Sequence, residues 1–280
     1  MSARFERPAS LAAALPLLAS GERAVLAGGT DLYPAHVGRA LSRPLVDITG
    51  IAALRGIRRT AAGWSIGATT TWTDLLRSTD LPPLFDALKQ AAREVGGMQT
   101  QNAGTLAGNL CNASPAADGA PVLMALDAVV VLRSAQQERR VAAVDFVLGS
   151  RRTVCAPNEL VVAVEIPGGS RRARSVFIKL GGRRYLTISM TMVAVVLDRD
   201  AAGAVTRAGI AVGSCSARAR RLPALEGKVL GGLPGADLAA LVQPADLAPL
   251  APIVDLRASA AYRLDATATL LRRALGALAE

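Results

Sequence analysis

The feature that most constrains this chain is the segment 99–121, QTQNAGTLAGNLCNASPAADGAP, where small and polar residues interrupt apolar sequence. It contains three Gly, four Asn or Asp, three Ser or Thr and two Pro, and its only apolar residues larger than Ala are two Leu and one Cys. A long irregular segment inside a compact domain is usually functional or disordered, and apolar flanks argue against disorder. We therefore predict that 99–121 is an irregular ligand-binding segment carried by a packed scaffold.

The composition allows a large core but disfavours nucleic acid as a partner. The chain has 280 residues, 51% of them hydrophobic and only 3% aromatic, so the core must consist of Ala, Val and Leu. The formal charge is +10, and 29 of the 32 basic residues are Arg. These arginines are scattered in pairs and form no stripe with aromatic residues between them, which favours an acidic protein partner or solubility over nucleic-acid binding.

The few cysteines and the single histidine argue against a metal centre on this chain. Cys111, Cys155 and Cys215 are far apart in sequence, no CxxC cluster occurs, and His36 is alone. We therefore expect neither zinc nor an iron–sulfur cluster here. Sparse cysteines suit a protein of the reducing cytoplasm. The sequence contains no run of 18 apolar residues, and so we predict no membrane span.

The N-terminal sequence LAAALPLLA (11–19) follows two arginines and superficially resembles a secretion signal. An amphipathic helix fits it better, because Ser10 is a good N-cap and Gly21 can end the helix. We expect this helix to be part of the mature fold.

Further along the chain, the patterns predict strands and helices in separate groups. We expect strands at 24–27, 45–48, 159–167, 176–180, 190–197 and 208–214, and a hairpin at 58–68. We expect one helix capped by Thr71 or Thr73 and others at 82–95, with Pro in the first turn, at 236–242 and at 258–278. The last of these should have one side made of Tyr262, Leu264, Ala268, Leu271 and Leu275. Within 122–132 we expect a helical turn or two before a strand. The polar, Gly-rich 168–175 is a candidate domain boundary, and the order of elements favours an α+β fold.

Two glycine-rich segments, LAGGTDL (26–32) and GTLAGN (104–109), are candidate phosphate sites. Glycine allows successive backbone amides to point into one concavity and bind an anion, and Thr30, Thr105, Asn109 and Ser114 can add donors. Two such segments could hold the two phosphates of a dinucleotide. Neither matches GxGxxG or GxxxxGK[ST], which disfavours a Rossmann fingerprint and a P-loop.

These segments resemble a known family. LAGGTDL, IGATTTWTDL (66–75), QNAGTLAGNLCNASPAADGAPVLMALDA (101–128), FVLGSRRTVCAPNELVVAVEIP (146–167) and FIKLGGRRYLTISM (177–190) are similar, in the expected order, to the FAD-binding medium subunit of molybdenum hydroxylases of the xanthine dehydrogenase and carbon monoxide dehydrogenase type. The resemblance implies an α+β fold with a two-part FAD-binding domain of the vanillyl-alcohol oxidase type over 1–168, divided near residue 55. A smaller α+β C-terminal domain over 175–280 would follow.

The resemblance also implies a cofactor site. It places pyrophosphate at 26–32 and 105–109, ribityl or ribose hydroxyls at Asp118, and the flavin ring near Val161 and Lys179. The predicted cofactor-binding residues are Leu26, Ala27, Gly28, Gly29, Thr30, Asp31, Leu32, Thr105, Ala107, Gly108, Asn109, Ser114, Asp118, Val161 and Lys179. The chain departs from the family pattern at Gln101, where Arg is frequent, at Ala107, where Gly is common, and at Ser150, where Tyr is frequent.

The implied function is electron transfer by bound FAD, with no catalytic or metal-binding residue on this chain. Molybdopterin and [2Fe-2S] clusters would lie on partners, a molybdopterin large subunit and an iron–sulfur small subunit, in a dimer of heterotrimers. One alternative is a self-contained FAD-dependent oxidase or dehydrogenase, for which His36 is the obvious base. Another is an apo scaffold or nucleic-acid-binding subunit that kept the fold.

Overall fold

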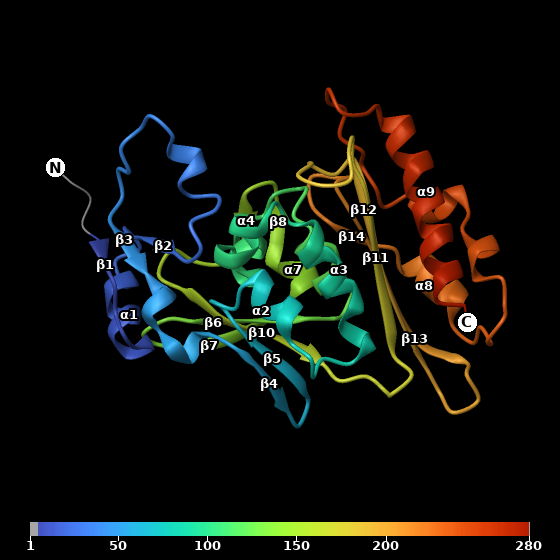
Figure 1. Cartoon of the computed structure of the whole chain (residues 1–280), viewed down its shortest axis with the longest axis horizontal. Helices are drawn as coiled ribbons and strands as arrows, with labels where there is room; N and C mark the ends of the chain where they lie inside the picture. The colour runs from blue at the N-terminus through green and yellow to red at the C-terminus, as the bar shows by residue number, and fades with distance from the viewer. Residues whose placement is uncertain (1–4, 280) are drawn as a thin grey trace.

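Three main β-sheets follow one another along the molecule, from the blue end to the orange end of Figure 1. This computed structural model describes residues 5–279. The first sheet is parallel and has the order β1-β3-β2, the second is antiparallel with the order β4-β5-β10-β6-β7, and the third is antiparallel with the order β11-β12-β13-β14. Helices and strands are therefore mixed as an α+β fold predicts, whereas the vanillyl-alcohol oxidase type and the domain bounds stay predictions.

The first sheet carries the predicted N-terminal helix. Its strands are β1 (Phe5–Glu6), β2 (Ala24–Leu26) and β3 (Leu45–Asp47). Helix α1 (Leu11–Leu18) begins where the Ser10 side chain accepts a hydrogen bond from the amide of Ala13, and its buried residues pack against β3 and the turns that follow. Those turns are the 3₁₀ segments η2 (Ile48–Gly50) and η3 (Ala52–Leu54), while η1 (Pro34–His36) lies in the connection between β2 and β3. The helix prediction is confirmed.

The second sheet is built around the central strand β10 (Leu160–Pro167). The predicted hairpin, β4 (Ile57–Thr60) and β5 (Gly63–Gly67), pairs with one edge of β10, and β6 (Val129–Arg133) with β7 (Glu138–Ala142) extends the other. A short helix α7 (Ala143–Phe146) and a two-stranded ribbon, β8 (Val147–Gly149) and β9 (Arg152–Thr153), lead back to β10. Helices α2 (Trp72–Arg77) and α3 (Asp86–Glu94) follow the hairpin, α2 with the predicted Thr71 cap and α3 only after the 3₁₀ turn η4 (Pro83–Phe85).

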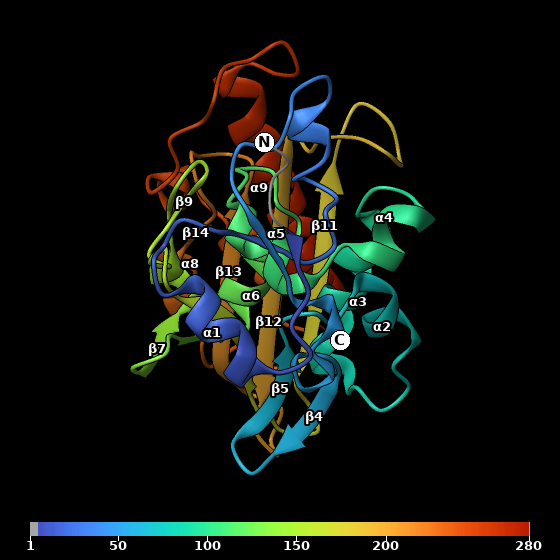
Figure 2. The same ribbon diagram turned by 90° about the vertical axis from the view of Figure 1, so that its left-hand side faces the viewer.

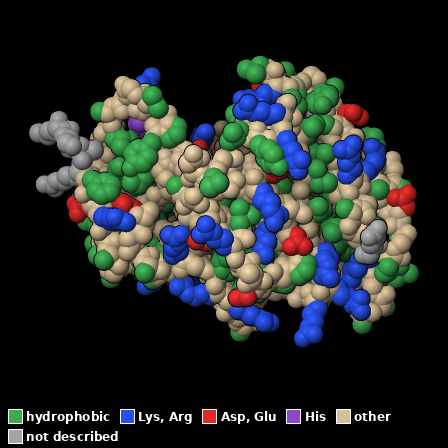
Figure 3. Space-filling model, in the orientation of Figure 1, with side chains coloured by type: hydrophobic (Ala, Val, Ile, Leu, Met, Phe, Trp, Pro, Cys, Tyr) green, Lys and Arg blue, Asp and Glu red, His purple; other side chains and the backbone are tan. Residues whose placement is uncertain are grey.

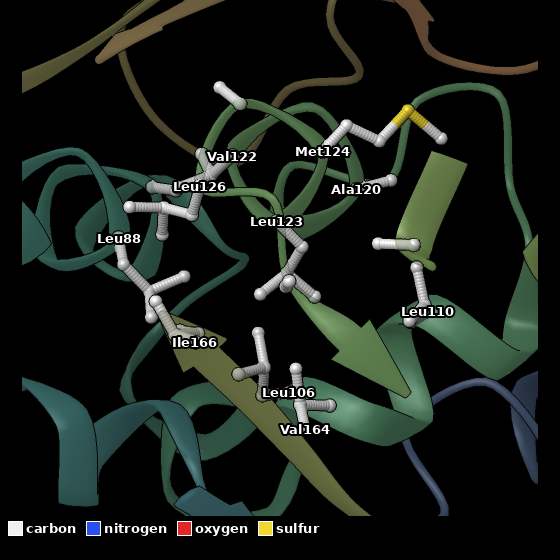
Figure 4. Packing of buried hydrophobic residues seen from close by; sticks show 14 of the residues in the cluster. Leu88, Leu106, Leu110, Ala120, Val122, Leu123, Met124, Leu126, Val164 and Ile166 are labelled. Atoms are coloured by element: carbon white, nitrogen blue, oxygen red, sulfur yellow. The ribbon is translucent and has the colours of Figure 1, made fainter. Parts of the chain in front are cut away.

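The prediction that 99–121 is irregular was wrong. The segment contains α4 (Met98–Ala103), α5 (Leu106–Asn112) and the start of α6 (Gly119–Ala125). Its polar side chains satisfy helix ends: the Thr105 hydroxyl accepts from the amide of Gly108, and Asn109 Oδ1 accepts from the amide of Gly119. Figure 4 shows Leu106 and Leu110 of α5 and Leu123 of α6 pointing into the same core as β10. Short helices that need many caps therefore explain the polar composition.

The third sheet packs on both faces. Its strands are β11 (Arg174–Leu180), β12 (Thr191–Arg199), β13 (Val205–Gly213) and β14 (Arg220–Arg221). Every residue of β12 is buried, because α3 and α6 cover one face and α8 (Pro223–Val229) and α9 (Ala260–Ala277) cover the other (Figure 2). Gly209 allows the close contact with α6, since a Cβ there would lie 2.0 Å from the Ala125 carbonyl oxygen.

Two helix predictions in this region need correction. The segment 236–242 forms only the 3₁₀ turn η5 (Leu238–Leu241), capped by Asp237, and a second turn, η6 (Pro244–Leu247), follows. Helix α9 exists as predicted, and Leu264, Ala268, Leu271 and Leu275 of the predicted face pack against the core, but Tyr262 is half exposed and its neighbour Arg263 is buried instead. Among residues 5–279, no helix is both long and apolar enough to cross a membrane.

Candidate functional site

A cavity of about 780 Å³ lies where the first sheet, helix α5 and strand β10 meet. Most of its walls come from three parts of the chain, namely 23–32, 104–117 and 153–161. This volume is in the range of cofactor sites. The cavity is the natural candidate for the predicted site, and it takes in both glycine-rich segments.

The first wall is the segment after β2, where Ala27, Gly28, Thr30, Asp31 and Leu32 line the cavity. The backbone leaves the strand, turns through Gly29 at φ +69° and enters η1. Within the described residues, the amides of positions 28–32 donate to no protein acceptor. Consecutive free amides of this kind form a concave anion site without any basic side chain.

Gly28 brings this segment into direct contact with the next wall. A Cβ on Gly28 would lie 1.9 Å from the carbonyl oxygen of Ala103 and 2.9 Å from the Cα of Gly104. In the reverse direction, a Cβ on Gly104 would lie 3.2 Å from the hydroxyl oxygen of Thr30. The two glycine-rich segments are therefore packed backbone to backbone, which only residues without side chains permit.

The second wall is the first turn of α5, where Thr105, Ala107, Gly108 and Asn109 line the cavity together with Ser114 beyond the helix. The sequence predicted a loop here, and the structure shows a helix start. Gly108 has no left-handed φ, and its amide donates to Thr105 Oγ1 at 3.0 Å. The partial positive charge at the N-terminus of α5 favours an anion beside this turn.

The third wall comes from β10 and the connection before it. Val161 lines the cavity at the point where the pairing of β10 with β6 shifts register. Glu159 lies beside it and is held by Arg139, whose Nε and Nη2 donate to its two carboxylate oxygens at 2.6 and 2.7 Å. These hydrogen bonds keep the pKa of Glu159 below its usual range, so the residue is an ionised structural anchor.

Two thiols also face this space. Cys111 and Cys155 line the cavity, and burial raises the pKa of the half-buried Cys155 to about 11 and also raises that of Cys111. Cys111 is exposed. Both thiols are protonated at neutral pH, and so neither is an activated nucleophile.

Four of the predicted site residues lie outside the cavity lining. Leu26 is a core residue, and Gly29 packs against the Tyr33 ring. Asp118 and Lys179 form an ion pair of 2.9 Å in which both side chains are buried, and Lys179 borders a second cavity of about 570 Å³ instead.

The Asp118 carboxylate already has protein partners. One oxygen accepts from Lys179 and the other accepts from the Ser189 hydroxyl at 3.2 Å. Burial raises the pKa of Asp118, and the lysine ammonium opposes that rise. Contact of Asp118 with ligand hydroxyls and of Lys179 with a flavin stays a prediction.

The structure adds two arginines that the sequence did not mark as site residues. Arg23 and Arg43 line the cavity beside β2. Arg43 donates to the carbonyl oxygens of Gly21, Glu22 and Arg23, which fixes the turn before the strand. No local motif distinguishes these arginines from the many others, and only the fold brings them to the cavity.

The residues present fit a dinucleotide with a pyrophosphate. Free amides, a helix start and the neutral donors Thr30, Asn109 and Ser114 suit phosphate oxygens, and the two glycine-rich segments meet backbone to backbone at this cavity. Apolar side chains such as Val161 line the same space and suit an aromatic ring system. No group of three or more His, Cys, Asp or Glu within residues 5–279 is arranged to hold a metal ion.

Comparison with known proteins agrees with this geometry. Residues 1–169 match the family described as "FAD binding domain in molybdopterin dehydrogenase", and residues 177–278 match the "CO dehydrogenase flavoprotein C-terminal domain". The two matches together span nearly the whole chain.

Individual relatives align over most of their length. The chain is 32% identical to the 6-hydroxypseudooxynicotine dehydrogenase complex subunit alpha of Paenarthrobacter nicotinovorans, covering 94% of this chain and 89% of that one. It is 33% identical to the carbon monoxide dehydrogenase medium chain of Afipia carboxidovorans, covering 97% and 94%. Its structure superposes on quinoline 2-oxidoreductase from Pseudomonas putida 86 with a TM-score of 0.90 at 25% identity, covering all of this chain and 97% of that one.

Proposed function

Because this chain belongs to the family of FAD-binding subunits of molybdenum hydroxylases, oxidoreductases of the xanthine and carbon monoxide dehydrogenase type, we propose that its cavity holds FAD for electron transfer. Electrons would come from an iron–sulfur subunit and leave to an external acceptor. The observation that carries the proposal is the cavity at the junction of the two glycine-rich segments.

The pyrophosphate would lie between these two segments. The amides of 28–32 would supply donors from one segment, the Ala107 amide, which donates to no acceptor among the described residues, would supply one from the first turn of α5, and Thr30 and Asn109 would supply side-chain donors. Two separate donor sets are needed only if the ligand has two phosphates, which favours FAD over FMN. The wall at Ala156, Pro157 and Val161 would exclude water from the rest of the cofactor.

Asp118 and Lys179 would act near the ribityl chain and the ring, as the family resemblance implies. Lys179 is buried and keeps a positive charge close to Asp118, and such a charge would stabilise an anionic reduced flavin. For Asp118 to accept a hydrogen bond from a ligand hydroxyl, its carboxylate would have to exchange the Ser189 hydroxyl for the ligand. This exchange needs no new buried charge.

FAD would supply the redox chemistry, since a flavin can take up two electrons and release them. The chain would bind the cofactor, orient it and keep water from it. Its cavity-facing thiols are protonated, and His36 contacts the Leu32 carbonyl oxygen at 2.8 Å through Nδ1. We therefore assign no acid–base or nucleophilic step to this chain.

The other redox centres would belong to other chains. We propose a molybdopterin-containing large subunit and an iron–sulfur small subunit as partners, in a dimer of heterotrimers. The relatives support this, because one is named as a subunit of a complex and another as a medium chain. The substrate would then bind to a chain other than this one.

The test starts with the purified chain. Its flavin is released by heat and identified by chromatography, and we expect about one FAD per chain; FMN, or no flavin, would contradict the proposed site. N-heterocycles, aldehydes and carbon monoxide are then added without oxygen while the flavin absorbance is followed. We expect no bleaching unless the partner subunits are present, and bleaching of the chain alone would favour a self-contained oxidase.

A further inference from the structure

We propose that Arg263, a buried arginine of the C-terminal helix α9, is a positioning residue for the cofactor site. It does not line the cavity, and we infer that it acts by fixing the backbone on which the segment 114–118 of the cavity wall depends. The inference rests on the proposed function, because the wall that Arg263 would position is the one assigned to FAD.

Arg263 is an exception among the basic residues of the chain. The Lys and Arg side chains in Figure 3 spread over this face of the molecule, whereas Arg263 is 2% exposed. A guanidinium is costly to bury unless its donors are used. Its Nη1 donates to the carbonyl oxygens of Met190 and, at 2.9 Å, Ser214, and its Nη2 donates to the carboxylate of Asp255 at 2.8 Å. One side chain therefore joins three segments that are distant in sequence.

The bond to Ser214 leads to the cavity wall. Ser214 directly follows β13 and has a φ of +59°, a left-handed conformation that few residues other than glycine adopt. Its amide donates to the Pro115 carbonyl oxygen at 3.0 Å, and the neighbours Ser114 and Ala116 line the cavity. Such a conformation persists only where the surroundings hold it. Here the contact with Pro115 holds the amide of the serine, and the contact with Arg263 holds its carbonyl group.

The bond to Met190 leads to Asp118. Met190 directly precedes β12, and its amide donates to the Leu180 carbonyl oxygen at 2.8 Å. Because Arg263 binds its carbonyl oxygen, Met190 is held from both sides. The residue before it, Ser189, is buried and donates its hydroxyl to the Asp118 carboxylate at 3.2 Å. The guanidinium therefore fixes the backbone from which this hydroxyl reaches the carboxylate.

Both connections end in the same five residues, 114–118. One reaches them through the Pro115 carbonyl group and the other through the Asp118 carboxylate. Beside these contacts, Ser214 Oγ and Arg263 Nε are buried without a partner among residues 5–279, which costs stability. Apolar side chains would join a helix to a sheet at a lower cost. The cost is understandable if the buried guanidinium is needed to hold the wall in place.

The experiment compares Arg263→Met with Arg199→Met in the full chain. Arg199 is the matched control because it is also buried and donates to three carbonyl oxygens, those of Gly203, Gly232 and Leu278. It lies at the opposite end of β12 from the Met190 contact, and none of its partners lines the cavity. Urea denaturation gives the stability of each flavin-free chain, a fluorescence titration gives its dissociation constant for FAD, and visible circular dichroism reports the surroundings of the bound flavin.

We expect both variants to be less stable than the wild type, but only Arg263→Met to differ in the cofactor site. It should bind FAD about tenfold more weakly and give a changed dichroism band at saturating FAD, whereas Arg199→Met should stay within about twofold of the wild type with an unchanged band. If Arg263→Met does not fold, Arg263→Lys takes its place, because lysine offers one nitrogen where the arginine uses two. The same change in affinity and dichroism is then expected.

Two results would overturn the role of Arg263 and leave the FAD site intact. One is wild-type affinity and an unchanged band in the Arg263 variant. The other is an equal loss of affinity in both arginine variants, which would show that FAD binding follows the general stability of the chain. A wild-type chain that binds no FAD would instead overturn the proposed function and the inference with it.

Discussion

Replacing Gly28 with Ala tests whether the two glycine-rich segments build one cofactor site. The new Cβ would lie 1.9 Å from the Ala103 carbonyl oxygen, and both groups near it belong to backbone. Packed carbon atoms normally approach non-bonded neighbours no closer than about 3.5 Å. No rotamer change can relieve this contact, so the segments must separate by more than about 1 Å.

The expected magnitude follows from the cost of overpacking, which is about 1–3 kcal/mol at a well-packed position. If the segments separate, FAD binding should weaken by roughly ten- to a hundredfold, since about 1.4 kcal/mol corresponds to a tenfold change in affinity. The free energy of unfolding of the chain without FAD should fall by a similar amount. Titration calorimetry with FAD and urea denaturation followed by tryptophan fluorescence measure the two effects separately.

Gly209→Ala is the matched control for this experiment. Its Cβ would lie 2.0 Å from the Ala125 carbonyl oxygen, which is an equal conflict at the contact of β13 with α6. Gly149→Ala, where a Cβ would meet no atom within 4 Å, shows the effect of an added methyl group alone. Gly209→Ala should lose stability to a similar extent but lose less affinity for FAD than Gly28→Ala, because it reaches the cavity wall only through α6. Equal affinity in Gly28→Ala and wild type would refute the proposed packing of the two segments around a phosphate.

Three other outcomes are expected. Asp118→Ala should lower the free energy of unfolding by about 3–5 kcal/mol because it leaves the buried Lys179 side chain without its paired carboxylate, and urea denaturation should show that the double replacement of Asp118 with Asn and Lys179 with Met recovers part of the loss. Gly108→Val should reduce flavin content severalfold, because a Cβ would lie 2.7 Å from the hydroxyl that caps α5. The ion pair of Glu159 with Arg139 should stabilise the chain above pH about 4 and lose its effect as the pH falls through the lowered pKa of Glu159. The difference in melting temperature between wild type and Arg139→Met, measured as a function of pH, would show this.

Each of these outcomes has a control that could contradict it. Additive losses in the Asp118 and Lys179 replacements would show that the two side chains do not interact. Gly276→Val, in α9 where a Cβ meets no atom within 4 Å, should keep its flavin. An equal flavin content in Gly108→Val and Gly276→Val would show that α5 is not part of the cofactor site. A stability difference between Arg139→Met and wild type that is the same at pH 3 and pH 7 would show that the ion pair contributes nothing.

Local signals in the sequence predicted most elements correctly. Ser10 and Thr71 cap helices as expected because an N-cap needs only a side-chain oxygen and the amides that follow it. The buried strand 159–167 corresponds to β10, since a continuous apolar run between turn residues has few other solutions. Such predictions depend on a few neighbouring residues.

The errors concern residues whose role depends on distant partners. Thr105 and Asn109 have the composition of loop donors, yet they cap α5 and α6, because helices this short are stabilised by packing that the local sequence does not reveal. The apolar pattern of α9 does not predict that Arg263 is buried, because such a pattern cannot anticipate a buried guanidinium. The burial becomes understandable only when Asp255 and the carbonyl oxygens of two distant segments are in place.

The position of α6 explains why the cofactor cavity and the C-terminal sheet are built together. Its first amide donates to Asn109 of the cavity wall, and its last turn packs on Gly209 of the sheet at a distance that excludes any side chain. Asp118, directly before the helix, pairs with Lys179 of β11. The ion pair and the contact at Gly209 are buried, and so a shift of the sheet would have to break one of them. The wall that carries Asn109 is therefore held by the sheet as much as by its own sequence, and a truncated chain that ends before β11 should not retain the cavity in this form.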